Sequence, residues 1–237
     1  MVVVSGCQPA SELEQQADSD QMPMNERLVP QFEVDPSWPV LPNDWILGSV
    51  ASVDVDSRDH VWIYHRPRSI DEAQQANAAP AVLEFDPDGN FVQGWGGPGD
   101  GYEWPSNEHG IEVDDQDNVW LGGNGGGESS DDMLLKFSRD GELVMQIGGR
   151  NTSGGNTDTD NLNRPSEAAV YRDTNEVFVA DGYGNRRVIV FDAETGAYKR
   201  MWGAFNNEPI DASDEQPPSG AELGPPQFGT VLSLIHI

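Results

Sequence analysis

The chain has 237 residues and a formal net charge of −28, from 41 acidic and 13 basic residues. So few lysines and arginines cannot replace the counterions condensed on a phosphate backbone, and we therefore expect no nucleic-acid partner. Such acidity suits an extracytoplasmic protein in a salty medium, where screening weakens self-repulsion. Seven tryptophans and eight phenylalanines in patterned runs indicate that the middle of the chain folds.

The first seven residues, MVVVSGC, end on the only cysteine of the chain, so no internal disulfide is possible. Val4 to Cys7 is similar to a bacterial lipobox, in which a small-residue cleavage site precedes the cysteine that receives the lipid. The basic start and longer apolar stretch of a complete signal are missing, so we interpret residues 1–7 as a truncated lipoprotein signal. The alternative is an incidental cysteine near the N-terminus.

Residues 8–37 are acidic and rich in glutamine, which predicts a disordered linker and lead-in. Together with the lipobox, this segment predicts a protein of the bacterial cell envelope, either a periplasmic or outer-membrane lipoprotein or a secreted protein. No run approaches the roughly 20 apolar residues of a membrane span, so we expect membrane contact only through a lipid on Cys7.

A polar turn followed by an apolar strand recurs at positions 56, 114 and 172, a spacing of 58 residues. Each unit continues with a second hairpin and ends on a tryptophan or isoleucine followed by glycine. The first hairpins are 56–63 (DSRDHVWI), 114–121 (DDQDNVWL) and 172–179 (RDTNEVFV), the second are 83–89, 135–141 and 190–196, and the units end at 95–96, 147–148 and 202–203. Four short strands per unit with polar turns between them predict the blades of a β-propeller, and a β-sandwich with coincidental spacing is the alternative.

The alternation of strand direction decides which loops share a face of the propeller. The tight 56–59 type turns and the second-hairpin turns fall at one end, and His60, which lies in such a turn, is expected to be structural. The loops between second and third strands and the connections between blades fall at the other end. That end collects the chemically unusual segments: 64–66 (YHR), 108–110 (EHG), the glycine run 122–127 and 181–186 (DGYGNR).

The stretch 177–191 (VFVADGYGNRRVIVF) is predicted to be a hairpin that presents Asp181, Tyr183, Asn185 and Arg186 at its tip. The glycine run lacks the lysine and helix of a phosphate loop, so nucleotide binding is not expected there.

Three units and the start of a fourth, near 227–231, occupy residues 38–231, whereas a propeller closes with about four to eight blades. We therefore interpret 38–231 as the first half of a six-bladed propeller. Residues 232–237 (LSLIHI) resemble a translated sequencing adapter and are interpreted as a non-native tail, so His236 is not considered as a ligand.

The units resemble NHL repeats, and the order of their motifs resembles the catalytic propeller of peptidylglycine alpha-amidating lyase and its uncharacterised bacterial relatives. That lyase has six blades and cleaves a peptidyl-α-hydroxyglycine at a zinc held by three histidines. The resemblance implies that His109 is the first zinc ligand, that Tyr183 is the base and that Arg66 is the substrate arginine. It also implies a structural calcium, faced by the main-chain carbonyls of Val50 and Ile111.

The chain departs from this family in ways that leave the function open. The second zinc histidine of the family would fall close to position 232, where the suspect tail begins, and Gly184 stands where the animal lyase has a cysteine. The leading hypothesis is a lipid-anchored propeller with a zinc-dependent, lyase-like site for a peptide or another small extracellular ligand, monomeric when complete. The alternative is a non-catalytic propeller that binds a peptide, glycan or protein partner on the same face, and a redox or calcium-dependent scaffold is a third, weaker hypothesis.

Overall fold

The computed structural model describes residues 32–211 and 228–234. It divides the chain into two units, 1–36 and 37–237, and the described part of the first unit, residues 32–36, contains no strand or helix. Cys7 and the greater part of the expected linker lie outside the described residues. Within the described ranges no helix is long and apolar enough to cross a membrane.

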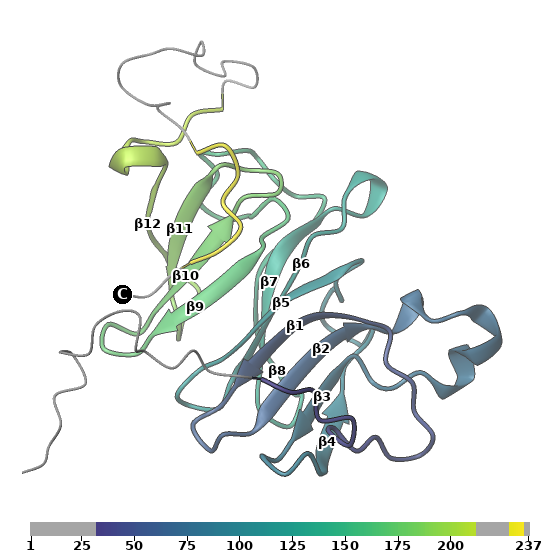
Figure 1. The fold of residues 1–237 in the computed structure, drawn as a ribbon. Coiled ribbons are helices and arrows are strands. Elements are labelled where there is room, and N and C mark those ends of the chain that lie inside the picture. The colour runs from purple at the N-terminus through teal and green to yellow at the C-terminus, as the bar shows by residue number, and fades with distance from the viewer. Residues whose placement is uncertain (1–31, 212–227, 235–237) are drawn as a thin grey trace, which may run out of the picture. The chain divides into compact units, whose positions relative to one another are not determined.

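The described residues of the second unit form twelve strands and four short 3₁₀ helices, so this part of the chain is all-β (Figure 1). The strands are β1 (Ser49–Val55), β2 (Val61–Arg66), β3 (Val82–Phe85), β4 (Phe91–Trp95), β5 (Glu108–Val113), β6 (Val119–Gly123), β7 (Asp131–Phe137), β8 (Leu143–Arg150), β9 (Glu167–Tyr171), β10 (Glu176–Asp181), β11 (Arg187–Asp192) and β12 (Tyr198–Trp202). The 3₁₀ helices are η2 (Pro67–Ser69), η3 (Glu72–Asn77), η4 (Gly127–Ser129) and η5 (Ala204–Asn206).

The strands form three four-stranded antiparallel sheets in sequence order, β1–β4, β5–β8 and β9–β12. The first strand of each sheet lies beside the first strand of the next, β1 against β5 and β5 against β9. This arrangement is that of consecutive propeller blades around an axis, and it confirms the predicted fold class. Each blade matches one 58-residue unit.

The repeated turns explain why these residues form hairpins. Asp56 and Asp114 each accept main-chain N–H groups from the residues two and four positions later, which closes the turn before the second strand. The fourth turn position has a left-handed backbone in every blade, and the short polar residues Asp59, Asp117 and Asn175 occupy it.

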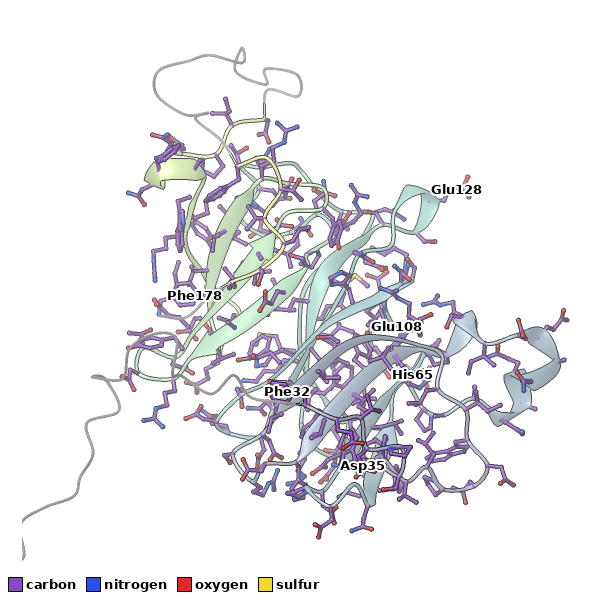
Figure 2. All side chains as sticks on the ribbon, viewed as in Figure 1. Phe32, Asp35, His65, Glu108, Glu128 and Phe178 are labelled. Atoms are coloured by element: carbon purple, nitrogen blue, oxygen red, sulfur yellow. The ribbon has the colours of Figure 1, made fainter. Side chains whose placement is uncertain are left out.

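The same aspartates also hold the buried tryptophan of the second strand. Asp56 Oδ2 accepts a hydrogen bond from Trp62 Nε1 at 3.2 Å, and Asp114 Oδ2 accepts one from Trp120 Nε1 at 3.0 Å. In the third blade the residues equivalent to the aspartate and the tryptophan are Arg172 and Phe178, and Figure 2 labels Phe178. A phenyl ring carries no N–H group, so the third blade needs no acceptor at position 172.

Apolar clusters fill the two boundaries between blades. Between the first two blades Trp62, Val82, Leu121 and Phe137 are fully buried, and between the second and third Val177, Ile189 and Leu162 are fully buried. The other face of the first blade packs against Trp38, Leu41, Trp45 and Leu47, and that of the third blade against Phe228, Val231 and Leu234. Residues 228–234, where the start of a fourth unit was predicted, form no strand.

Two carboxylates on the innermost strands tie each blade to the next. Asp54 Oδ2 accepts the Val113 N–H at 2.6 Å, and Glu112, 58 residues after Asp54, accepts the Val170 N–H through Oε1 at 3.0 Å. Burial raises the pKa of the Asp54 carboxyl, and it raises the pKa of Glu112 to about 7, with smaller contributions from Asp54 and other acidic neighbours. These two bonds hold the three inner strands in register.

Replacing Asp114 by Ala should lower the free energy of unfolding by about 2–4 kcal/mol, because it opens the β5–β6 turn and leaves the buried Trp120 N–H without an acceptor. Urea unfolding measures this change. The matched control is Arg172→Ala at the equivalent, exposed position of the third blade, which should change stability by less than about 0.5 kcal/mol. Equal losses in both variants would contradict this account of the turn.

The raised pKa of Glu112 makes part of the stability depend on pH. The folded state binds this proton more tightly than the unfolded chain, so the contribution is complete below about pH 4.5 and is lost as the pH rises towards about 7. Glu112→Gln keeps an oxygen acceptor for Val170 without the charge. The stability difference between variant and wild type should therefore shift in favour of the variant between pH 4.5 and 7.5. If the difference in urea midpoint between Glu112→Gln and the wild type did not change with pH, this prediction would be wrong.

Candidate functional site

Arg66 is the last residue of β2 and reaches across to the second blade. Its Nε donates to the main-chain carbonyl of Glu108 at 2.8 Å. The two residues before it, Tyr64 and His65, belong to the strand and are fully buried, so they lie in the core of the blade and not on the loop face. His65 is a structural residue, since Nδ1 accepts the Gly48 N–H and Nε2 donates to the Pro80 carbonyl.

His109 lies at the start of β5 and is held on both ring nitrogens. Nδ1 lies 2.9 Å from the carbonyl oxygen of Ser166, which can only accept, so Nδ1 carries the proton. In the neutral ring Nε2 is then the acceptor, and it lies 2.9 Å from the Tyr183 hydroxyl. Burial lowers the pKa of His109, and the nearby charge of Arg66 lowers it further, so the neutral ring is favoured.

Tyr183 reaches this ring from the β10–β11 loop of the third blade. The two rings meet edge to face, with their centroids 5.0 Å apart. The loop backbone packs tightly here, because a Cβ on Gly182 would collide with the main chain of Val231 and one on Gly184 would collide with Asn163. Arg164 also donates to the Tyr183 carbonyl at 2.7 Å. The phenol itself stays partly exposed at 36%.

Asp181 and Asn185, also predicted at this tip, have structural roles, whereas Arg186 is held through its main-chain N–H, which donates to Asn156 Oδ1. Asp181 and Arg187 are fully buried and form an ion pair at 2.9 Å. Asn185 donates to the same Asp181 oxygen, and the guanidinium also binds carbonyl oxygens of the 156–161 segment. The predicted tip of the hairpin therefore contributes one exposed site residue, Tyr183. The ion pair between Asp181 and Arg187 holds the loop that carries it.

Val50 and Ile111 occupy different positions in their strands. Val50 pairs with His65 before a bulge in β1, whereas Ile111 pairs with Leu121 after a bulge in β5. The residue of the first blade at the register position of Ile111 is Val53, which pairs with Ile63.

Asp56, His60 and Glu84 form the group of three possible metal ligands found among the described residues, with ligand atoms within 4.8 Å of one another. It lies among the tight turns at the opposite end of the blade from His109. His60 Nδ1 contacts Glu84 Oε1 at 2.7 Å, Arg58 contacts Asp56 at 2.7 Å, and Arg139 also pairs with Glu84. The carboxylates already have cationic partners here, in keeping with the structural role predicted for His60.

Ser166 and Glu108 were not singled out for these contacts by the sequence reasoning. Ser166 matters through its main-chain carbonyl, which any residue would offer, so no sequence signal marks it. Its hydroxyl bonds the Ala180 and Val231 carbonyls and fixes the segment that carries that acceptor. Glu108 directs its carbonyl to Arg66 and its carboxylate to Trp104 and Arg68. The sequence signal for Glu108 was its position immediately before His109.

The arrangement of sheets and loops defines the chain as part of a β-propeller with a histidine, a tyrosine and an arginine from three successive blades on one face. No protein-family model matches the chain. It is 27% identical over 187 residues to peptidyl-alpha-hydroxyglycine alpha-amidating lyase 1 of Drosophila melanogaster, covering 70% of this chain and 31% of that protein. It is 28% identical over 165 residues to NHL repeat-containing protein 3 of Mus musculus, covering 68% and 43%.

Among solved structures, a gluconolactonase from Xanthomonas campestris is similar, with a TM-score of 0.39, 19% identity and coverage of 64% of this chain and 46% of that one. The chain thus spans less than half the length of each of these three proteins. The curated relatives, taken with the three sheets, support an NHL-like propeller family.

The hydrogen bonds of His109 lead to a spectroscopic prediction. At neutral pH its ring should carry the proton on Nδ1, because the Ser166 carbonyl can only accept, and its pKa should lie below that of an ordinary histidine. Long-range ¹H–¹⁵N NMR of labelled protein, assigned with a His109→Gln variant, measures both. A proton on Nε2 at neutral pH, or a pKa above 6.5, would contradict this geometry.

Proposed function

We propose that this face is a metal-dependent, lyase-like site that cleaves a peptidyl-α-hydroxyglycine. The curated relatives suggest an amidating-lyase-like propeller. The observation that carries the proposal is the direct contact between His109 and Tyr183, residues 74 positions apart, with the imidazole fixed in one tautomer.

His109 has the properties of one zinc ligand. Neutral imidazole binds zinc through one nitrogen, and the other nitrogen of such a ligand usually donates to a carbonyl or carboxylate, as Nδ1 does to Ser166. The Tyr183 hydroxyl occupies the Nε2 lone pair in this structure, so a metal bound there requires that hydroxyl to withdraw. The described residues provide no second histidine beside His109, and a zinc site in this place needs further ligands from elsewhere.

The proposed reaction removes the proton of the substrate hydroxyl, breaks the C–N bond and protonates the departing amide nitrogen. The products are a peptide amide and glyoxylate, with no change in total charge. Tyr183 would act as the base for the substrate hydroxyl, and Arg66 would hold the substrate carboxylate. Arg66 Nε donates to the Glu108 carbonyl. The two terminal nitrogens of this guanidinium make no hydrogen bond to the described residues, so they remain available to a substrate carboxylate. Zinc, when bound, would make the substrate hydroxyl more acidic.

The remaining expectations also belong to this proposal. A structural calcium would be faced by the carbonyls of Val50 and Ile111, since hard cations prefer oxygen ligands. β1 and β5, which carry these residues, lie side by side. The partner is a peptide or another small extracellular ligand, and the lipobox at Cys7 supports an anchored or secreted protein of the bacterial envelope, monomeric when complete.

Metal analysis of the whole gene product tests the site. His109→Ala should abolish stoichiometric zinc without changing the circular dichroism spectrum, because the ring is a ligand and not part of an apolar cluster. His60→Gln is the matched control and should retain the metal, since His60 belongs to the opposite face. Tyr183→Phe should keep zinc and lose about 10²–10⁴-fold in turnover of an α-hydroxyglycine peptide.

Zinc that persists in the His109 variant would overturn the metal assignment. Full zinc without turnover of the peptide would favour the non-catalytic binding propeller.

A further inference from the structure

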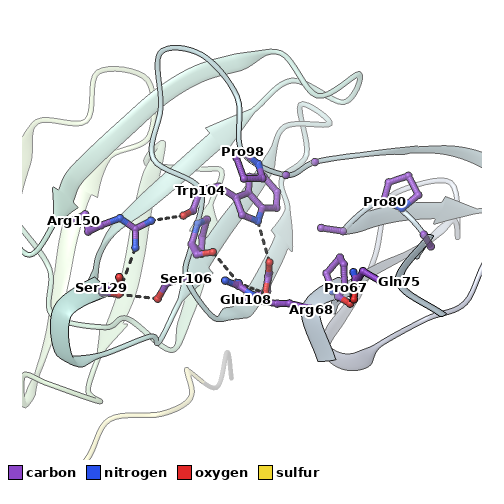
Figure 3. Close-up of a pocket in the computed structure, with 15 residues that line it drawn as sticks. Pro67, Arg68, Gln75, Pro80, Pro98, Trp104, Ser106, Glu108, Ser129 and Arg150 are labelled. Carbon is purple, nitrogen blue, oxygen red and sulfur yellow. Dashed lines mark hydrogen bonds and ion pairs between the residues drawn. The ribbon is translucent and has the colours of Figure 1, made fainter. Parts of the chain in front are cut away.

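A cavity lies on the loop face, between the first and second blades (Figure 3). Its volume is about 560 Å³, within the range of sites that hold small organic ligands. Its walls come from the loop after β2, from the connection between β4 and β5, and from the second blade near η4 and the end of β8.

The cavity is separate from the His109 and Tyr183 pair. Adjacent residues of β5 serve the two places: the Glu108 carboxylate lines the cavity, whereas the His109 ring bonds Ser166 and Tyr183 of the third blade. None of His109, Tyr183 and Arg66 lines the cavity.

On the polar side of the cavity, the Arg68 guanidinium has N–H donors without a partner among the described residues. Glu108 is only 3% exposed and both of its oxygens are occupied, Oε1 by Trp104 Nε1 at 3.0 Å and Oε2 by Arg68 Nη2 at 2.8 Å. The Arg68 side chain is 51% exposed, and all its hydrogen bonds to described residues leave from Nη2. Nε and Nη1 therefore retain unused donors. Arg150 adds a second guanidinium to the lining, 26% exposed.

The remaining wall is mainly apolar and rigid. Pro67, Pro80, Pro98 and the ring of Trp104 line it, and Gly96 lies so close to Trp104 that a Cβ there would approach the ring to 2.7 Å. Proline rings and a packed indole lose little conformational entropy when a ligand binds.

We propose that this cavity binds a small organic carboxylate with an apolar body, of about the size of an acylated amino acid. The Arg68 donors receive the carboxylate and the proline and tryptophan wall receives the body. A monoanion suits this cavity better than a phosphate dianion, because the only basic residues lining it are Arg68 and Arg150, and each already lies beside one carboxylate, that of Glu108 and that of Asp131.

Isothermal titration calorimetry with N-acetylphenylalanine tests the proposal, with the uncharged N-acetylphenylalaninamide as the matched ligand control. The acid should bind with one site per chain, and the amide at least tenfold more weakly. Arg68→Gln should weaken binding of the acid at least tenfold, whereas Arg172→Gln, an exposed arginine in the third blade, should leave it unchanged.

A second pair of variants keeps the test decisive if Arg68→Gln disturbs folding through buried Glu108. Gln75→Glu places a negative charge at the exposed edge of the cavity and should weaken binding of the acid about threefold to tenfold. Gln116→Glu makes the same change in an exposed turn of the opposite face and should have no effect. No binding of the acid, equal binding of acid and amide, or binding unchanged in both Arg68→Gln and Gln75→Glu would overturn the proposal.

Discussion

The hydrogen bond from a carboxylate on one inner strand to a main-chain N–H on the next sets the geometry of this protein. Asp54 makes it across the first blade boundary and Glu112 across the second. Each bond fixes the height of one blade relative to its neighbour, since a slip of the strand would break it and would also misalign the apolar boundary clusters. The meeting of His109 with Ser166 and Tyr183 depends on the second boundary staying in register. The desolvation of Glu112 is the energetic cost of this arrangement.

The architecture could be read from the sequence because its causes are local and repeated. A turn closed by an aspartate, a left-handed residue at the fourth position and a tryptophan that needs an acceptor recur at a fixed spacing, and each leaves a residue-level mark. The third blade tests this logic, since Arg172 and Phe178 depart from the pattern together. Residues 228–234 do not form the strand expected at the start of a fourth unit. A sequence motif that starts a unit does not by itself supply a strand with a pairing partner.

The loop face was also predictable, because the direction of each strand follows from its order in the blade. It was harder to predict which residues of that face have free side chains and which are held by their neighbours. Asp181 and Asn185 have the chemistry of site residues, yet their side chains are consumed by Arg187 and the neighbouring loop. The Ser166 acceptor is a main-chain atom that composition cannot reveal. The positions of Val50 and Ile111 depend on where the bulges fall, and a bulge changes register by one residue without a distinct sequence signal.

The bulge in β5 has a consequence for how such a propeller can diversify. Four residues of β5, from Glu108 to Ile111, face three residues of β6, from Gly123 to Leu121, so the start of the strand is released from strict alternation while Ile111 to Val113 keep their pairing. The side chain at position 109 can therefore change without moving the residues that pack the blade boundary, whereas a Cβ on Gly110 would lie 2.5 Å from the Ser166 carbonyl oxygen and Glu108 is held by Trp104 and Arg68. The strand thus combines a regularly paired segment, which fixes the blade boundary, with a bulged start, which presents His109 to the loop face.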